Sequence, residues 1–321
     1  MLPSVQFKQV LDLTPYLKGR EIISEGICFD GSLAVLVVEP EAKDLPFART
    51  EQGIGNFPRS TSKESFVMSL LRFGDDPNSE KQGNARVNEI ELAPSASSYP
   101  QVQMFPDNSI LVARSRCSLR ADGPELNATI YSEKGEVLRH FCLGDGIQDL
   151  KVSPSGEIWV SYFDEGICGN FGWTEDAIGA PGINCFDKTG EKIWCFEALG
   201  DIETIDDCYA MSIVGDEVVA CYYSDFPIIR ISKDKQITAW HNQVAGANAI
   251  AVCGDKVLLY GGYEEPSRCI LQTLGKDGIA SDLTQIALSM PDKFSGETVS
   301  CHDSDLHVVV DSRWYRLRLD V

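Results

Sequence analysis

The chain has 321 residues, of which 43% are hydrophobic and 9% aromatic, and its formal net charge is −20. Such values are typical of a folded globular protein with a large core and exclude intrinsic disorder for most of the chain. A strongly negative surface repels phosphate backbones, so we do not expect nucleic acid as a partner. Cations and basic protein surfaces are favoured instead, unless the charge serves solubility alone.

Targeting and cysteine patterns predict a cytoplasmic protein without a membrane segment. Met1–Val5 has no basic segment followed by an apolar stretch, so no signal peptide is expected. Apolar runs such as Leu33–Val38 are too short to cross a bilayer. The eleven cysteines include no CxxC pair, and most lie in apolar runs, as Cys28 and Cys208 do. This pattern is typical of reduced, buried thiols.

Six hairpins follow one another along the chain, each with an apolar strand, a tight turn and a second strand rich in β-branched or aromatic residues. The turns contain Gly, Asp, Asn, Ser or Pro, which supply the positive φ or Asx geometry of tight hairpins. The predicted second strands are 33–39, 110–114, 157–162, 217–223, 256–261 and 306–311.

A further hairpin follows most of these units, with turns at 132–136, 187–191, 232–235 and 275–278. Two successive hairpins make a four-stranded antiparallel meander. Its repetition at a spacing near the ~40–50 residues of propeller blades predicts a radial β-propeller. No long stretch has the periodicity of a helix.

The two ends of the chain predict how the ring closes. The last unit supplies strands at Thr298–His302, Leu306–Asp311 and Trp314–Val321, and a fourth is available in Val5–Leu13. Pairing these ends would remove exposed sheet edges. We therefore predict an all-β chain whose residues 1–321 form a single six-bladed β-propeller of four-stranded antiparallel blades, closed by the N-terminal strand in the last blade.

One half-blade also carries a family likeness. The segment 146–160, GIQDLKVSPSGEIWV, is similar to NHL-type and TolB-type half-blades. Over nearly its whole length the chain resembles the six-bladed β-propeller superfamily that includes TolB-like, NHL-repeat and gluconolactonase-like proteins. A WD40-repeat protein is disfavoured, because no regular Trp-Asp dipeptide ends the third strands. The resemblance implies a fold and leaves the function open.

Long loops are predicted on one face of the propeller. In blades one to three, the loops between the second and third strands are Pro40–Ser65, Ser115–Leu126 and Phe163–Pro181, whereas in the later blades they are short. In a propeller, such loops emerge on the face where the chain enters the first strand of each blade. We therefore expect a shared recognition surface, with tolerated loop variation as the alternative.

The third loop is the richest candidate for contact with a ligand. Residues 162–173, YFDEGICGNFGW, combine aromatic rings, carboxylates, an amide and glycines, which suit close contact. Cys168 is the cysteine we would test as a nucleophile. An equally weighted alternative is that the aromatic rings pack as a small satellite core. The expected ligand-binding residues are Tyr162, Asp164, Glu165, Asn170, Trp173 and, at the channel mouth, Gln148.

The central channel gives a second candidate site. Alignment of the first strands places Gln101, Tyr209 and Glu297 near its mouth, together with Glu25, Gln148, Asp149 and Asn248. The gluconolactonase-like resemblance implies that Glu25 and Asn248 hold a divalent cation. Asp149 or Asp207 would stand in for a further aspartate of that family, which has no clear match here. Oxygen ligands suit calcium, which would polarise a lactone or ester carbonyl. Polar residues are also expected in a water-filled channel without a metal.

Three functions remain open from these patterns. The first is a module that binds a protein or a small molecule on the loop-bearing face. The second is a metal-assisted hydrolase that resembles lactonases or esterases, and the third is a structural domain that assembles with its own kind. No P-loop, GxSxG elbow or dinucleotide fingerprint favours another catalytic class. The sequence leaves open whether the chain is an enzyme.

Overall fold

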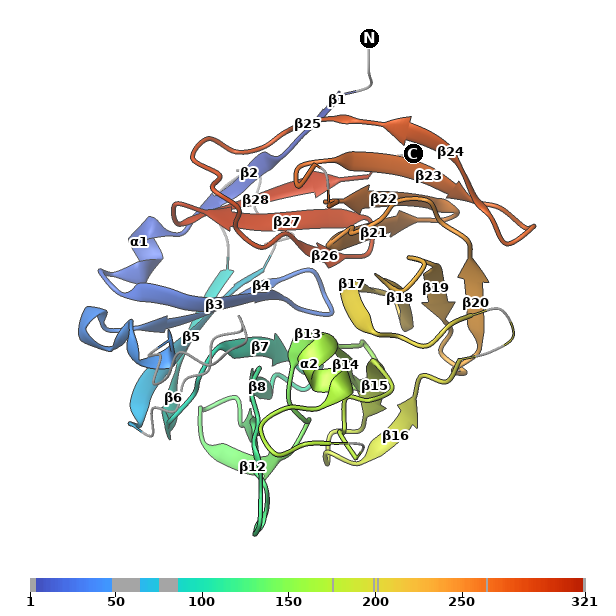
Figure 1. Cartoon of the computed structure of the whole chain (residues 1–321). Coiled ribbons are helices and arrows are strands. Elements are labelled where there is room, and N and C mark those ends of the chain that lie inside the picture. The colour runs from blue at the N-terminus through green and yellow to red at the C-terminus, as the bar shows by residue number, and fades with distance from the viewer. Residues whose placement is uncertain are drawn as a thin grey trace.

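Six four-stranded antiparallel sheets surround a central axis, which confirms the predicted six-bladed β-propeller (Figure 1). The structure is a computed structural model that describes residues 4–47, 64–74, 86–174, 176–198, 200, 202–263 and 265–319. Within these ranges, no helix is long and apolar enough to span a membrane.

Each blade is a meander whose strands run outward from the axis in sequence order, except in blade six. Blade one consists of β3 (Glu21–Ile27), β4 (Leu33–Val38), β5 (Phe66–Gly74) and β6 (Arg86–Ser95). Blade two consists of β7 (Pro100–Met104), β8 (Ile110–Arg114), β11 (Ala128–Tyr131) and β12 (Val137–Phe141). Blade three consists of β13 (Ile147–Val152), β14 (Ile158–Tyr162), β15 (Ile183–Phe186) and β16 (Lys192–Cys195). Blade four consists of β17 (Asp207–Val214), β18 (Glu217–Tyr223), β19 (Ile228–Ile231) and β20 (Ile237–Trp240). Blade five consists of β21 (Ala249–Cys253), β22 (Lys256–Tyr260), β23 (Cys269–Leu274) and β24 (Ala280–Gln285). Blade six consists of β26 (Ser300–His302), β27 (Asp305–Val310), β28 (Arg313–Arg318) and β2 (Lys8–Asp12).

Short elements fill the connections between the blade strands. Two of them, α2 and the β9–β10 hairpin, lie in the long loops of blades three and two. The short elements are α1 (Thr14–Leu17), the 3₁₀ turns η1 (Pro40–Ala42) and η2 (Leu45–Phe47), β9 (Leu119–Arg120), β10 (Gly123–Pro124) and α2 (Asp164–Cys168).

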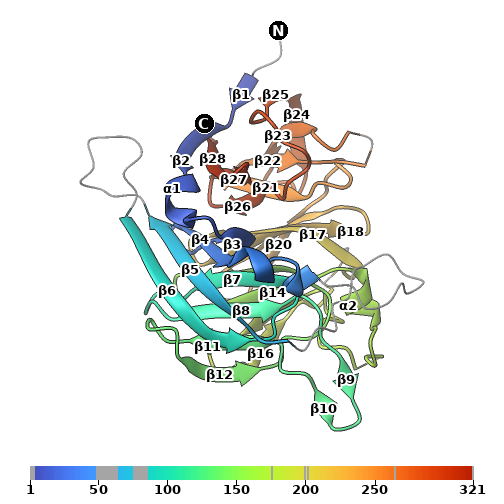
Figure 2. The ribbon, with the colours of Figure 1, turned by 90° about the vertical axis from the view of Figure 1, so that its left-hand side faces the viewer.

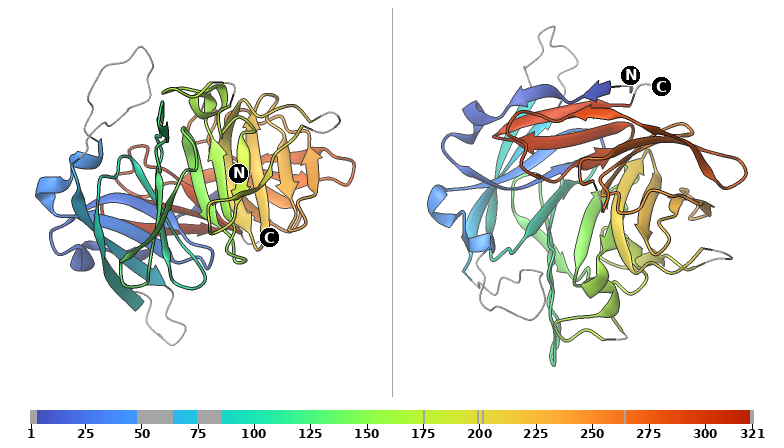
Figure 3. Two further views of the ribbon diagram at one scale, coloured as in Figure 1. Left: turned by 90° about the horizontal axis from the view of Figure 1, so that it is seen from below. Right: turned by 45° about the horizontal axis from the view of Figure 1, so that its top comes forward.

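The N-terminal segment closes the ring, as predicted. β2 pairs antiparallel with β28 as the outer strand of blade six, with Leu11 opposite Trp314. An additional strand, β1 (Ser4–Gln6), pairs in parallel with β25 (Ala287–Ser289), which follows blade five. The blue N-terminal strands therefore lie beside the red and orange C-terminal ones in Figures 1 and 3. The first strands of neighbouring blades contact one another around the whole ring.

The hydrophobic core lies between the blades. All six residues of β4 are buried. One core cluster joins Leu36 of blade one to Val102 of blade two, and another joins Trp159 of blade three to Met211 of blade four. A third combines Leu11 and Trp314 of blade six with Leu71 of blade one. Because burial of apolar area is the main favourable term in folding, the blades stabilise one another rather than folding singly.

A buried lysine fills the axis at mid-depth. Lys151 of β13 has its ammonium 3.8 Å from the Asp149 carboxylate. It also donates to the backbone oxygen of Cys301 in blade six, on the opposite side of the ring, at 3.4 Å. β17 of blade four also contacts β26 of blade six at the centre. Contacts between blades that are not neighbours therefore cross the axis of the predicted channel.

Closure of the ring gives a testable prediction. Leu11 is 5% exposed and packs in the core cluster of blades six and one. Leu11→Ala should lower the free energy of unfolding by about 2–4 kcal/mol, through the lost apolar contact and the cavity left behind. Denaturant unfolding measures the change. Gln9→Ala, on the same strand but exposed, should change it by about 0.5 kcal/mol or less. Equal effects of the two substitutions would contradict this packing.

Candidate ligand-binding face

The long loops of blades two and three meet on one face of the ring. The Leu119 N–H donates to the Phe171 oxygen at 3.0 Å, and the Trp173 indole N–H donates to the Cys117 oxygen at 2.8 Å. Figure 2 shows α2 and the β9–β10 hairpin on the same side of the propeller. The described part of the first loop contacts the chain that enters blade two, where the Pro46 oxygen accepts from the Tyr99 N–H at 3.1 Å. Residues 48–63 of that loop lie outside the described residues.

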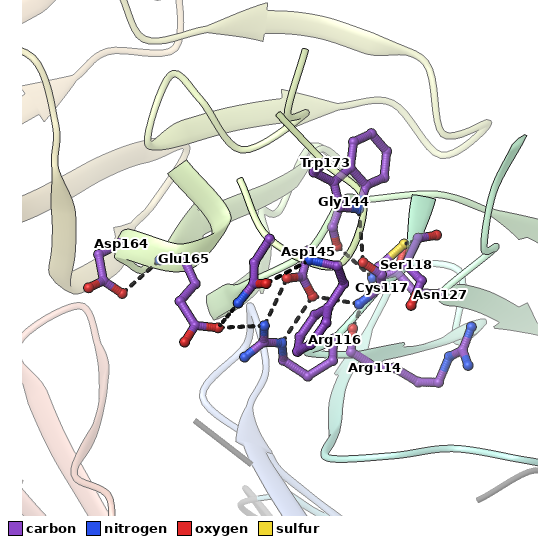
Figure 4. A network of polar contacts seen from close by, with 12 residues as sticks. Arg114, Arg116, Cys117, Ser118, Asn127, Gly144, Asp145, Asp164, Glu165 and Trp173 are labelled. Carbon is purple, nitrogen blue, oxygen red and sulfur yellow. Dashed lines mark hydrogen bonds and ion pairs between the residues drawn. The ribbon is translucent and has the colours of Figure 1, made fainter. Parts of the chain in front are cut away.

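A buried arginine holds these loops together. Arg116, 6% exposed, binds both carboxylate oxygens of Asp145, at 3.0 Å through Nε and 2.9 Å through Nη2. The same Nη2 donates to Glu165 Oε2 at 2.6 Å, so one guanidinium joins the second loop, the entry to β13 and α2 (Figure 4). Its side chain also packs over the rings of Phe171 and Phe163. We call Arg116, Asp145, Glu165 and Asn170 the arginine hub.

Further hydrogen bonds complete the arginine hub. Asn170 donates from its side-chain amide to Glu165 Oε2 at 2.8 Å, and the Cys117 N–H donates to Asp145 Oδ1 at 2.6 Å. Burial raises the pKa of Asp145, against the opposing effect of the hydrogen bonds from Arg116. Two carboxylates share one guanidinium, so the hub keeps a net negative charge. Removal of the guanidinium would leave a buried carboxylate without its partner cation.

Glycines bring α2 against the blade. Gly146 has φ +70°, and a Cβ atom there would lie 2.4 Å from the Cα of Gly166 in α2. A larger residue at either position would push the helix away from the entry to β13. The glycines of the third loop thus serve backbone packing, whereas the sequence suggested close approach of a ligand.

The structure separates the six residues expected to bind a ligand into three groups. Asp164 and Gln148 are exposed, whereas Glu165 and Asn170 belong to the arginine hub and are partly buried. Trp173 is 7% exposed and packs with Cys117 and Ala177, so the satellite-core alternative describes it.

Tyr162 and Cys168 also differ in their exposure. Tyr162 is fully buried, and its hydroxyl donates to the Leu143 oxygen. Cys168 is exposed at the end of α2. Its position leaves the thiol open to reagents, while Tyr162 takes part in the core of blades two and three.

Two carboxylates, of Asp164 and Asp207, lie near each other where α2 packs on β17. Asp207 begins β17, and α2 contacts that strand. Burial and the nearby charge of Asp164 raise the pKa of Asp207 to about 7. Among the described residues, no side chain donates a hydrogen bond or forms an ion pair with the Asp207 carboxylate. Within the described part of the chain, these two like charges are therefore held near each other without an ion pair to Asp207.

Aromatic rings of blades four and five lie beside this pair of carboxylates. The Tyr209 and Tyr263 hydroxyls are hydrogen-bonded at 2.7 Å, and the Tyr209 ring stacks on Phe226 with a centroid distance of 6.1 Å. Tyr263 stands edge-on to Phe226 at 5.6 Å and is 59% exposed. The nearby charges of Asp207 and Asp164 help to raise the pKa of Tyr209, after burial and the Tyr263 hydrogen bond. The acidic–aromatic rim is Asp164, Asp207, Tyr209, Phe226 and Tyr263.

Sequence reasoning gave too little weight to two of the five rim residues. Phe226 and Tyr263 lie in the short loops of blades four and five, whereas loop length drew attention to blades one to three. The available signal was composition, because both short loops carry aromatic residues next to acidic ones.

The residues expected to hold a cation occupy different positions. In β3, Glu25 lies two residues before Ile27, the last paired residue ahead of the hairpin turn. In β13, Asp149 lies three residues before the corresponding residue, Val152. Because side chains alternate along a strand, Glu25 and Asp149 point to opposite faces of their blades. Asn248 precedes β21 and is exposed. Among the described residues, no group of three or more His, Cys, Asp or Glu side chains is arranged to hold a metal ion.

Glu25 nevertheless has an unusual environment. Burial and the charge of Glu297 raise the pKa of the Glu25 carboxyl to about 7. Burial likewise raises the pKa of Asp149, against the opposing effect of Lys151. The calcium site formed by Glu25, Asp149 and Asn248 stays a prediction.

Comparisons with known proteins find distant similarities. A family model, the YxzG family, matches residues 183–265, which is less than half of the chain. No curated protein matches the sequence. A catalytically inactive virginiamycin B lyase from Staphylococcus aureus with quinupristin is 10% identical with a TM-score of 0.47, and the match covers 99% of both chains.

Two further solved structures are similar at the same level. The PQQ-bound aldose sugar dehydrogenase from Streptomyces coelicolor is 12% identical with a TM-score of 0.46, over 94% of this chain and 97% of that one. A gluconolactonase from Xanthomonas campestris is 11% identical with a TM-score of 0.43, over 99% and 97%. All three TM-scores lie below 0.5.

The arginine hub gives the second prediction. Arg116→Gln should lower the free energy of unfolding by about 3–5 kcal/mol, because Asp145 stays buried without its cation. Asp145→Asn in the same chain should restore part of the loss. Denaturant unfolding of both variants measures the two effects.

The control for this prediction is Arg120→Gln. Arg120 also pairs with a glutamate but its side chain is 51% exposed, so the expected loss is about 1 kcal/mol or less. An equally small loss for Arg116→Gln would contradict the hub.

Proposed function

We propose that the chain is a binding module that takes a positively charged group of a protein or small-molecule ligand on the acidic–aromatic rim. The observation that carries the proposal is the packing of α2 against β17, which brings the Asp164 and Asp207 carboxylates near each other. Burial and the charge of Asp164 raise the pKa of Asp207 to about 7. Two adjacent carboxylates repel each other, and a bound cation would relieve that repulsion. Perturbed groups of this kind cluster at functional sites.

The aromatic members of the rim suit the same ligand. Ring faces carry negative charge density and attract ammonium or guanidinium groups. Tyr263 is largely exposed, and Tyr209 lies close enough to Asp207 and Asp164 for both charges to affect its pKa. A cation at this rim would contact rings and carboxylates together. The formal net charge of −20 would also speed the approach of a basic partner.

The arginine hub supports the rim by fixing α2. Glu165 is bound by both Arg116 and Asn170, so the helix that carries Asp164 is held from within. A preorganised site loses less conformational entropy when a ligand binds. This arrangement gives the buried network a role in recognition that needs no direct contact with the ligand.

The proposal predicts charge-dependent and pH-dependent binding. Isothermal titration calorimetry with a tetralysine peptide should show binding at about pH 8 that weakens roughly tenfold at about pH 6, since Asp207 becomes mostly protonated below its folded pKa. The fully acetylated peptide, which lacks the side-chain charges, should not bind. Asp207→Asn should weaken binding at about pH 8 and remove the pH step.

The control for Asp207 is its neighbour Asp206, which is exposed and accepts a hydrogen bond from Ser224. Asp206→Asn should bind the peptide like the wild type. Asp207→Asn should not melt below the wild type at about pH 8, because it removes a repulsion present above the raised pKa. Equal binding of the charged and acetylated peptides would overturn the proposal.

A metal-assisted lactonase-like or esterase-like hydrolase is the second candidate. Glu25 favours it, because a carboxyl with a pKa of about 7 beside Glu297 would be stabilised as a carboxylate by a divalent cation such as calcium. In this candidate the Glu25 carboxylate would hold the cation, and the cation would polarise a substrate carbonyl.

This second candidate predicts a bound metal. Elemental analysis of purified protein should find about one divalent ion per chain, and a chelator should lower the melting temperature. Glu25→Gln should abolish both effects, while Glu21→Gln, at an exposed position of the same strand, should keep them. Protein without metal and with an unchanged melting temperature would reject the hydrolase.

A further inference from the structure

Two cysteines far apart in the sequence meet beside the arginine hub. The sulfur atoms of Cys117 and Cys142 lie 3.6 Å apart, although the two residues are 25 positions apart in the sequence. Cys117 follows Arg116 in the second long loop, and Cys142 directly follows β12. All eleven cysteines are free thiols, so this pair is reduced.

The two thiols have different surroundings. Cys117 is 1% exposed, and its sulfur lies 3.1 Å from the Glu125 oxygen. Cys142 is partly exposed, and its sulfur accepts from the Gly144 N–H at 3.4 Å. The hydrogen bond between the two sulfurs lowers the pKa of Cys142 and raises that of Cys117. Cys142 is therefore the more nucleophilic and more accessible of the two, and Cys117 is a protonated neighbour.

We propose that Cys117 and Cys142 form a redox modification site, at which a hydroperoxide converts the two thiols into a disulfide. The proposal is independent of the acidic–aromatic rim and of its ligand. It assigns attack on the oxidant to Cys142 and disulfide closure to Cys117.

The reaction proceeds in two steps whose atoms and electrons balance. The Cys142 thiolate attacks one peroxide oxygen and the O–O bond breaks, which gives a sulfenic acid on Cys142 and releases an alcohol or water. The Cys117 thiol then loses its proton and attacks the Cys142 sulfur, so that an S–S bond forms and the sulfenic oxygen leaves as water. The two sulfurs lose two electrons in total, and the hydroperoxide gains them. The sulfurs must approach from 3.6 Å to about 2.05 Å, which a small movement of the chain around Cys142 supplies.

The disulfide would act directly on the arginine hub. The Cys117 N–H donates to Asp145 and its oxygen accepts from Trp173, so Cys117 is already fixed between the second and third loops. A covalent link to Cys142 would tie the second loop to the chain that enters blade three. The loops that carry the ligand-binding face would then be held more rigidly than in the reduced protein.

The test uses the full chain treated with a small molar excess of hydrogen peroxide. Thiol titration should show the loss of two of the eleven thiols, and mass spectrometry of the digested protein should identify a peptide linked through Cys117 and Cys142. The melting temperature should rise by about 5 °C, since the cross-link restricts the unfolded chain. Dithiothreitol should reverse all three changes.

Variants separate the roles of the two cysteines. Cys117→Ser should accumulate a sulfenic acid on Cys142 that a cyclic diketone traps, while Cys142→Ser should react at least tenfold more slowly. Cys168→Ser, at the exposed cysteine of α2, should form the linked peptide like the wild type. A melting curve of each reduced variant shows whether the variant is folded. If Cys142→Ser is not folded, Cys142→Ala takes its place. Absence of the linked peptide, or trapping on Cys117 instead of Cys142, would overturn the proposal.

Discussion

The pairing of β2 with β28 is the interaction on which the rest of the structure depends. It supplies the fourth strand of blade six and so gives every first strand a neighbour on both sides around the axis. A closed ring has no open blade edge at its seam, and its core lies between blades. Opening that seam would expose the cluster of Leu11, Trp314 and Leu71 and would separate blade one from blade six. The common face of the loops exists only because the ring is closed.

Buried charge at the axis and under the loops marks places where the propeller departs from a simple apolar core. At the axis, Lys151 is paired with Asp149 and bridges to the opposite blade, so that a polar contact fills the centre. Under the loops, Arg116 is paired with Asp145 and Glu165. Buried pairs contribute little net stability compared with apolar packing, but they penalise any arrangement that leaves one partner alone. Both pairs therefore favour a single arrangement of the strands and loops around them.

The acidic–aromatic rim and the dithiol lie on opposite sides of the arginine hub. The rim is reached through α2, whose Glu165 is held by Arg116, while Cys117 is bonded to Asp145 on the other side of the guanidinium. Cys117 is therefore linked to Asp164 through three contacts, Cys117–Asp145, Asp145–Arg116 and Arg116–Glu165, and the peptide bond between Asp164 and Glu165. A short series of hydrogen bonds and ion pairs, between groups with little freedom to rearrange, connects the Cys117–Cys142 dithiol with the acidic–aromatic rim. Whether the two sites influence each other is decided by how far the hub itself shifts.

Sequence alone determined the all-β fold, the blade count and the closing strand, because hairpin turns and alternating strands are local signals that repeat six times. It also pointed to Asp164, Glu165 and Asn170 through the unusual composition of one loop. The tertiary structure decided which of those side chains face outward, since Trp173 and Tyr162 are apolar enough to be buried as well as to bind. It alone brought Arg116 to Asp145, Asp207 to Asp164 and Cys117 to Cys142. Such pairs lie from 25 to 43 positions apart, and no periodicity in a single chain records which distant side chains will meet.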